Sequence, residues 1–290
     1  MNLVSVIIPT YNREKTIIKC IDSVLKQTYK NIEVIVVDDC SSDNTEKIVK
    51  STYGTKVKYL KLKKNSGACI ARNKGIDISK GEYIAFQDSD DVWHEDKLEK
   101  QLNIMIEQNA DISFCNFNKY STKSSSYKEL PILQEGFISY EKLLEKSVVS
   151  TQCIVAKSCC FKKIKFDSNM PRLQDWDVIL QLSKEFSVYH INEGLVDMYV
   201  QDDSISSHPE KGLIAIKYII EKNKEAIYKN KNILRNIYIN VAYYKILNKQ
   251  NPKEEYKEAL KIKFSFEIFL RYILSKLHFL FFVYKIVGKI

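Results

Sequence analysis

The chain has 290 residues, 45% of them hydrophobic, which is enough for one large domain with an appendage or for two domains. Its net charge of +9 is unevenly distributed, because residues 211–290 hold 17 lysines and arginines against 6 acids. This basic part is rich in aromatic and aliphatic residues and has no Gly/Arg-rich or RNP-like signature, which argues against nucleic acid as a partner and favours an anionic membrane surface.

Seven cysteines are scattered along the chain, and their odd number and spacing match neither a disulfide framework nor a zinc site. We expect reduced and mostly buried thiols, as in a cytoplasmic protein. The N-terminus offers no secretory signal, because the apolar run Val4–Ile8 is short, lacks a preceding basic segment and stops at Pro9.

The first hundred residues alternate short apolar runs with amphipathic segments. In chain order we predict a strand at 3–8, a helix at 14–26, a strand at 32–37, a helix capped by Ser41–Asp43 and running through Val49, a strand at 57–62, a helix at 68–78, a strand at 83–86 and a helix at 96–108. Strands that alternate with helices form parallel βαβ units, so we predict an α/β fold with a mainly parallel sheet covered on both faces.

From residue 111 onward the pattern is less regular. We predict strands at 112–115, 153–156 and 195–200, helices at 140–145 and from Asp175, and a loop at 121–127. Residues 211–290 are predicted to be helical, with a break at Asn251–Pro252. The predicted domains are an α/β domain at 1–210, with halves at 1–110 and 111–210, and a basic helical extension at 211–290.

Acidic side chains follow two strands of the first half, at the point where each strand ends. Asp38 and Asp39 follow the second strand, and Asp88, Asp90 and Asp91 follow the fourth. Ligands of such sheets bind at the carboxyl ends of the strands, which meet at one edge. Acids gathered there repel one another unless a cation is present, and Mg²⁺ and Mn²⁺ prefer carboxylate and phosphate oxygens. The sequence therefore predicts a site for a divalent metal and a phosphate-bearing ligand.

The glycine-rich phosphate loops of other nucleotide-binding folds are missing from the sequence. There is no G-x-G-x-x-G after the first strand, which disfavours a dehydrogenase, and no G-x-x-x-x-G-K-[ST] anywhere. Phosphate charge must then be met by a metal and by basic side chains. Arg72, one turn into the helix after the third strand, is the candidate cation.

Four segments carry a resemblance to a known family. They are Val4–Asn12, Val36–Ser41, Asn65–Asn73 and Gly81–Asp90, the last ending in the D-x-D motif Asp88-Ser89-Asp90. These segments look like the motifs of the inverting family-two glycosyltransferases of the GT-A fold, the bacterial surface-polysaccharide type. Their order, spacing and predicted context agree over residues 3–110, whereas the resemblance is weaker over 111–210 and absent beyond.

The resemblance implies a pocket for the nucleotide base. Pro9, Tyr11 and Asp39 would line it, with the Tyr11 ring against the base and Asp39 accepting a hydrogen bond from a ring N–H. Uracil presents such a donor, which favours a UDP-sugar, although thymine and guanine present one too.

The resemblance also implies roles at the fourth strand end. Asp88 and Ser89 would hold the ribose and orient Arg72. Asp90 would bind the metal, Mn²⁺ or Mg²⁺, that bridges the two phosphates and stabilises the departing nucleoside diphosphate. Asp38 and Asp91 are better explained by turn, capping or supporting roles than by ligand binding.

An inverting transfer needs a general base opposite the leaving group. The family places this carboxylate at a helix start in the second half, commonly as Glu-Asp before an aromatic residue. This sequence has Gln174-Asp175-Trp176 there, so Asp175 is the matching position and Asp177 is its rival. Gln174 departs from the usual Glu. Trp176 is a candidate for sugar contact, although such residues are more often packed in the core.

A second departure from the family lies near residue 200. Relatives often have Tyr-Arg and then a His, where this sequence has Val200 and Asp202. The residues of that loop that contact the phosphates are therefore not assigned, and His208 is the candidate to replace the family's residues there. His94, His190 and His278 are predicted to be structural.

The segment Lys263–Lys289 has a broad apolar face and a narrow, mostly basic stripe when it is projected as a helix. Its charges are too many for a comfortable transmembrane span. A helix that lies in the membrane interface fits this pattern, and the alternatives are a helix that packs on the catalytic domain or forms a homodimer contact.

The sequence thus predicts a cytoplasmic enzyme peripheral to the inner membrane. It would transfer a hexose or N-acetylhexosamine from a UDP-sugar, bound by residues 1–110, to a hydroxyl of a glycan held by residues 111–210. The acceptor would be lipid-linked, in capsule, O-antigen or exopolysaccharide synthesis, and the missing Gln-x-x-Arg-Trp motif argues for single additions. The rivals are a non-catalytic nucleotide-sugar or membrane-binding module and a sugar-nucleotide pyrophosphorylase, which would show a Gly-rich N-terminus.

Overall fold

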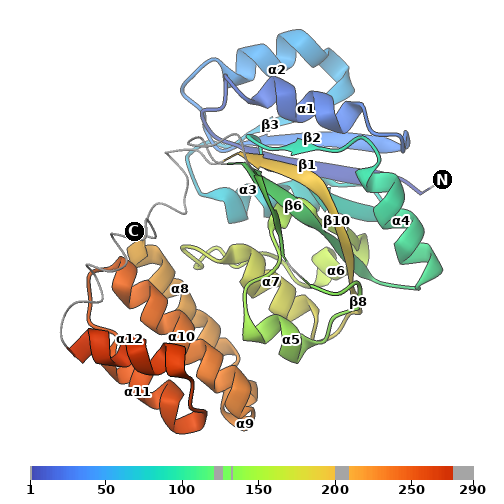
Figure 1. The fold of residues 1–290 in the computed structure, drawn as a ribbon. Coiled ribbons are helices and arrows are strands. Elements are labelled where there is room, and N and C mark those ends of the chain that lie inside the picture. Colours follow the sequence, from blue (N-terminus) through green and yellow to red (C-terminus); the bar gives the residue numbers. More distant parts are fainter. Residues whose placement is uncertain (1, 121–126, 132, 200–208, 277–290) are drawn as a thin grey trace. The chain divides into compact units, whose positions relative to one another are not determined.

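The computed structural model describes residues 2–120, 127–131, 133–199 and 209–276. It divides into two compact units (Figure 1). The first consists of residues 1–139, 148–168 and 174–201, and the second of residues 140–147, 169–173 and 202–290. The strands of the first unit form one ten-stranded sheet.

The N-terminal half of the first unit has the predicted βαβ pattern. Its elements are β1 (Val4–Thr10), α1 (Ile17–Leu25), β2 (Ile32–Asp38), α2 (Thr45–Tyr53), β3 (Val57–Lys61), α3 (Ala68–Ile78), β4 (Tyr83–Phe86), the short β5 (Val92–Trp93) and α4 (Lys97–Glu107). Strands β3, β2, β1 and β4 are neighbours in that order, and all three pairings are parallel. Only β5 was missed among the strands, because two residues carry no periodicity.

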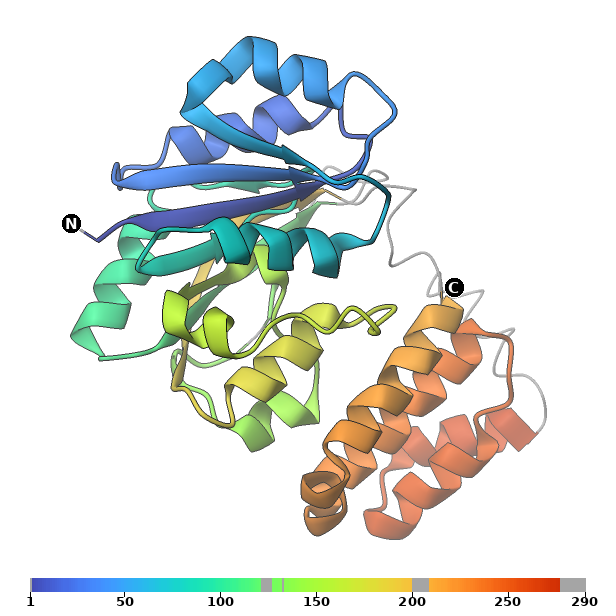
Figure 2. The ribbon, with the colours of Figure 1, turned by 180° about the vertical axis from the view of Figure 1, so that it is seen from behind.

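Both faces of this parallel sheet are buried. All seven residues of β1 and all four of β4 are buried. Helices α1 and α2 cover one face, and α3 covers the other (Figures 1 and 2). A strand buried on both faces needs a continuous apolar run rather than an alternating one, which is why these strands were readable from the sequence.

The second half extends the same sheet with strands of both directions. It contains β6 (Ile112–Tyr120), β7 (Tyr127–Leu130), β8 (Gly136–Phe137), β9 (Ile154–Lys157), α6 (Ser158–Lys163), α7 (Gln174–Leu182) and β10 (Val188–Tyr199). Strand β9 is antiparallel to both β4 and β6, so β6 points the same way as β4, and β10 runs parallel to β6. The carboxyl ends of β1, β2, β4, β6 and β10 therefore meet at one edge of the sheet, which we call the rim.

Strand β10 begins earlier than the predicted strand at 195–200. Its pairing with β6 shifts in register between Ile191 and Gly194 and again between Gly194 and Val196. Such an irregularity breaks the alternation of apolar and polar residues, so the first half of the strand was hidden in the sequence.

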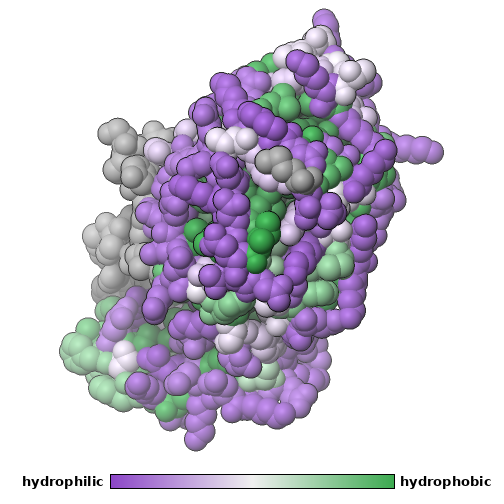
Figure 3. All heavy atoms as spheres, turned by 90° about the vertical axis from the view of Figure 1, so that its right-hand side faces the viewer, coloured by the Kyte–Doolittle hydropathy of each residue, from purple (hydrophilic) through white to green (hydrophobic). Residues whose placement is uncertain are grey.

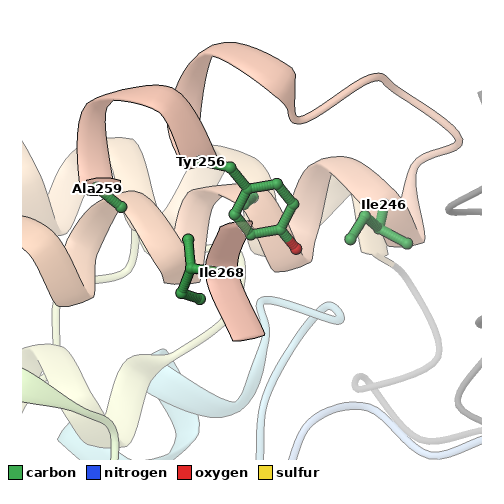
Figure 4. Packing of buried hydrophobic residues seen from close by; sticks show 5 residues of the cluster. Ile246, Tyr256, Ala259 and Ile268 are labelled. Carbon is green, nitrogen blue, oxygen red and sulfur yellow. The ribbon is translucent and has the colours of Figure 1, made fainter. Parts of the chain in front are cut away.

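The second unit is helical. It contains α5 (Tyr140–Glu145), α8 (Pro209–Lys222), α9 (Lys224–Lys229), α10 (Lys231–Leu247), α11 (Lys253–Ile262) and α12 (Phe266–Lys276). The predicted break at Asn251–Pro252 is confirmed between α10 and α11. A core cluster of Ala242, Ile246, Tyr256, Ala259 and Ile268 joins α10, α11 and α12 (Figure 4). None of the described helices is long and apolar enough to cross a membrane.

Three aromatic rings pack together in the core at the end of β4. The ring centroid of Phe86 lies 4.8 Å from that of Phe161 and 5.2 Å from that of Phe166, both in edge-to-face geometry. We expect Phe86→Ala to lower the free energy of unfolding by about 3–5 kcal/mol, because the cavity it leaves is enclosed by packed rings. Urea denaturation followed by circular dichroism measures this change.

The matched control is Ile106→Ala, because the Ile106 side chain on α4 is 65% exposed. We expect the control to change the free energy of unfolding by less than about 0.5 kcal/mol. A similar small effect of both substitutions would contradict the packing role of Phe86.

Candidate functional site

Side-chain hydrogen bonds tie the loops after β1 and β2 together at the rim. The backbone N–H of Asn12 donates to Ser41 Oγ at 2.9 Å, and the N–H of Ser42 donates to Asn12 Oδ1 at 2.9 Å. Asn12 and Cys40 both adopt left-handed backbone conformations, with φ of 51° and 68°. Positive φ at non-glycine residues is uncommon and persists where neighbouring contacts enforce it. Tyr11, beside this junction, is 44% exposed and available to a ligand.

Asp38 is occupied by structural contacts, as predicted. Its Oδ1 accepts from the backbone N–H of Ser41 at 2.7 Å, and the Tyr59 hydroxyl donates to Oδ2. The buried carboxylate therefore closes the turn after β2 and joins it to β3.

Asp39 joins β2 to the start of α3. Its two carboxylate oxygens accept from the backbone N–H groups of Ser66 and Gly67, both at 2.7 Å. Gly67 precedes α3 with φ of 92°, a conformation that favours glycine. These contacts were not anticipated from the sequence, although the glycine before the helix was a signal. Each oxygen keeps a second lone pair, so the base-binding role of Asp39 stays a prediction, as does that of Pro9, which is buried within β1.

Arg72 bridges Asp88, 16 residues away in the sequence, and Gln174, 102 residues away. Its Nη2 donates to Asp88 Oδ1 at 2.8 Å, and its Nη1 donates to Gln174 Oε1 at 3.2 Å. The guanidinium carbon lies 5.4 Å from the centroid of the Phe166 ring, and the side chain is buried. The Gln174 carboxamide accepts from Arg72 as a glutamate would, without adding a negative charge, so this departure from the family keeps the geometry.

The rim also carries hydrogen-bonding capacity that the protein does not use. The Nε of Arg72 and Oγ1 of Thr10, at the end of β1, are buried atoms without a hydrogen-bond partner among the described residues. Buried polar groups in native proteins are nearly always paired, so orphan groups are typical of functional sites.

The acidic turn after β4 presents two of its carboxylates at the surface. The Asp88 and Asp90 side chains are 30% and 22% exposed, whereas Ser89 is buried. Arg13 Nη2 lies 3.7 Å from Asp90 Oδ2. This second cation was missed in the sequence, although its position two residues after Tyr11 places it on the same rim.

Asp91 holds the acidic turn in place rather than facing a ligand. Its carboxylate accepts from Gln152 Nε2 and from the backbone N–H of Tyr199, both at 3.0 Å. Burial, followed by the neighbouring charges of Asp88 and Asp90, raises the pKa of Asp91 well above its ordinary value. The supporting role predicted for Asp91 is confirmed, and Gln152 is a partner that sequence reasoning missed.

Asp175 is the second residue of α7 and lies within electrostatic reach of the Arg72 and Asp88 pair. Burial raises its pKa, and the hydrogen bond from the Trp176 N–H and the charge of Arg72 oppose that shift. The rival Asp177 is buried, whereas Asp175 is partly exposed. Trp176 is also buried, which makes it a packing residue rather than a platform for a sugar.

The rim residues fit a divalent metal by their donor chemistry. Among the described residues no group of three or more His, Cys, Asp or Glu is arranged to hold a metal. Mg²⁺, however, is typically bound by one or two carboxylates together with substrate phosphates. The exposed oxygens of Asp88 and Asp90 match that donor set. Val200, Asp202, His208 and His278 lie outside the described residues.

Comparison with known proteins gives consistent matches. The chain matches the family model Glycosyl transferase family 2 over residues 5–165. It is 34% identical over 212 residues to the putative teichuronic acid biosynthesis glycosyltransferase TuaG of Bacillus subtilis, covering 72% of this chain and 83% of that protein. It is 34% identical over 213 residues to WfgD of Escherichia coli, covering 73% of this chain and 82% of that protein. WfgD is named a UDP-Glc:alpha-D-GlcNAc-diphosphoundecaprenol beta-1,3-glucosyltransferase.

A solved structure shows the same fold. The crystal structure of S. aureus TarS 1–349 in complex with UDP-GlcNAc superposes with a TM-score of 0.64 at 20% identity. The superposition covers 95% of this chain and 79% of that chain. The predicted GT-A fold is thereby confirmed.

The buried bridge of Arg72 generates a prediction about stability. We expect Arg72→Ala to lower the free energy of unfolding by about 2–3 kcal/mol, because Asp88 and Gln174 lose their shared donor. The control Lys74→Ala removes an exposed cation from the same helix, 3.8 Å from Asp77, and should cost less than about 0.5 kcal/mol. Urea denaturation of the three proteins compares them, and equal effects of the two variants would contradict the bridging role.

Proposed function

This chain belongs to glycosyl transferase family 2, and from that premise we propose that it transfers a hexose or N-acetylhexosamine from a UDP-sugar to a hydroxyl of a lipid-linked glycan. The observation that carries the proposal is the rim cluster, in which Arg72 joins Asp88 to Gln174 beside Asp90 and Asp175. One edge of the sheet thus gathers a cation, a pair of carboxylates suited to a metal, and a carboxyl group of raised pKa.

Two matches support the substrate classes. TarS, which shares the fold, has been crystallised with UDP and with UDP-GlcNAc. The relative WfgD is named for a UDP-glucose donor and a diphosphoundecaprenol-linked acceptor, and TuaG for teichuronic acid biosynthesis. We carry over to this chain a UDP-sugar donor and a role in surface polysaccharide synthesis.

In this proposal residues 1–110 bind the donor. The exposed ring of Tyr11 packs against the base, and Pro9, Asp39 and Ser89 shape the nucleoside pocket. Asp88 orients Arg72, whose guanidinium meets the negative charge of the diphosphate.

Asp90 holds the divalent ion of the donor complex. When bound, such an ion neutralises charge that develops on the departing nucleoside diphosphate, and either Mn²⁺ or Mg²⁺ suits carboxylate and phosphate oxygens. Arg13 Nη2, 3.7 Å from Asp90 Oδ2, helps to orient that carboxylate.

Asp175 acts as the general base. It accepts the proton of the acceptor hydroxyl as the oxygen attacks the sugar on the face opposite the diphosphate, which inverts the configuration. A base is most effective when its pKa lies near the working pH, and burial moves the pKa of Asp175 in that direction. Residues 111–210 hold the acceptor, and the basic helices of residues 211–290 bring the enzyme to the cytoplasmic face of the inner membrane.

The donor site is tested first by nucleotide binding. Calorimetry with UDP, GDP, dTDP and CDP, each with and without Mn²⁺, should show metal-dependent binding of UDP. We expect Asp90→Ala to weaken that binding at least about tenfold, because the metal loses its protein ligand. The control Asp96→Ala removes an acid that pairs with Lys100 at the start of α4 and should bind UDP normally. UDP binding that is independent of metal and unchanged in Asp90→Ala would contradict the assigned role.

The base is tested by kinetics. Asp175→Asn should lower kcat by about 10²–10⁴-fold with little change in UDP affinity, because only proton transfer is lost. In the wild type, activity requires the ionised base and falls as the pH drops through its pKa. Burial raises that pKa above the ordinary aspartate value of 3.8, so the acid limb of the kcat profile should lie above pH 3.8. Full activity of Asp175→Asn together with loss of activity in Asp177→Asn would assign the base to the rival.

A further inference from the structure

Helix α12 has apolar side chains on two opposite faces. Ile268, on its inner face, belongs to the cluster formed with α10 and α11 (Figure 4). Tyr272 packs against the same cluster, and Ser275 is buried. At about 100° per residue these three side chains fall within a sector of about 60°. A helix that packs on one core normally turns polar residues outward.

The outer face of α12 is apolar instead. At about 100° per residue Phe266 and Leu270 lie opposite Ile268, and Phe269 lies about 100° from it. These three side chains are 67%, 45% and 38% exposed. Phe264, just before the helix, is 67% exposed, and its ring centroid lies 6.0 Å from that of Phe269. We call these four residues the aromatic patch. On the face of the molecule drawn in Figure 3, hydrophilic residues dominate and apolar residues form small separate groups. Exposed apolar side chains gathered into one patch often mark an interaction site.

Basic residues flank the aromatic patch in the sequence, and two of them pair with acids of their own helices, Lys261 with Glu258 and Arg271 with Glu267. Between residues 260 and 276 four basic residues stand against the single acid Glu267. They are Lys261, Lys263, Arg271 and Lys276. Arg235 of α10 adds a further cation, because its Nε donates to the Lys263 carbonyl at 3.3 Å.

We propose that the aromatic patch of α12 is a docking surface for a membrane that contains anionic lipids. This inference rests on the proposed function, because a lipid-linked acceptor requires the enzyme at a bilayer. The aromatic side chains enter the boundary between headgroups and acyl chains, and the surrounding cations meet the lipid phosphates. Charge complementarity favours this occupant over a second copy, since two segments that each hold 17 basic and 6 acidic residues would repel each other.

Vesicle flotation of the full-length protein tests the proposal. The vesicles contain either phosphatidylcholine alone or phosphatidylcholine and phosphatidylglycerol in equal parts. The wild type should float with the anionic vesicles only, and added salt should weaken the binding. The double variant Phe264→Ser/Phe266→Ser should partition at least about tenfold more weakly, because two exposed rings no longer enter the bilayer.

The matched control removes two exposed apolar side chains from the first unit. Ile106 and Phe137 are 65% and 55% exposed, so Ile106→Ser/Phe137→Ser removes comparable surface. This control should float like the wild type. A second variant, Lys261→Gln/Lys263→Gln, should keep the aromatic patch but lose most of the preference for anionic vesicles.

Three outcomes would overturn the proposal. The patch variant could float as well as the wild type, or the control could lose flotation equally. A wild type that ignores vesicles but forms a dimer which the patch variant abolishes would assign the surface to a second copy, measured by light scattering. UDP binding by calorimetry, which tests the proposed donor site of the first unit, separates these results from failure of the proposed function. An unchanged helical signal in circular dichroism shows that the patch variant keeps the fold of the second unit.

Discussion

The buried guanidinium of Arg72 is the interaction on which the arrangement of the rim depends. It is held between the carboxylate of Asp88, after β4, and the carboxamide of Gln174, at the start of α7. A buried cation needs such partners, because the free energy of removing it from water is large. The same contact therefore fixes α3, the acidic turn and α7 relative to one another, and it places Asp175 beside the proposed diphosphate site.

Five carboxylates lie at the strand ends on one edge of the sheet, and their different environments give them different roles. Asp38, Asp39 and Asp91 are buried and accept hydrogen bonds from backbone or side-chain donors, so they hold loops in place. Asp88 and Asp90 remain partly exposed. The hydrogen bonds to Asp38, Asp39 and Asp91 offset part of the cost of their burial, which leaves Asp88 and Asp90 to meet a ligand. Asp38 and Asp91 thus support the proposed donor site without contacting the donor, whereas Asp39 also lines the proposed base pocket.

The helical unit buries one face of α12 and leaves apolar side chains of that helix exposed. The core cluster of α10, α11 and α12 buries Tyr256 and Ile268, and it does not use the aromatic patch of α12. Exposing apolar surface to water costs free energy. An exposed apolar patch on a folded unit therefore often marks a site that contacts a membrane or a partner. In the proposed function the first unit acts on the hydroxyl of the acceptor, and α12 contacts the membrane that holds the lipid of the acceptor.

The sequence by itself determined the βαβ half and the acidic strand ends, because buried parallel strands are continuous apolar runs and their loops carry polar residues at regular places. The GT-A fold was predicted from the resemblance of four segments to a known family. The register shifts of β10 and the contacts of Asp39, Arg13 and Gln152 were decided only by the tertiary structure. These features depend on pairings between residues far apart in the chain, which local periodicity does not encode. The roles of Arg72 and Asp88 came from matching motifs, whereas their shared contact with Gln174 required the folded molecule.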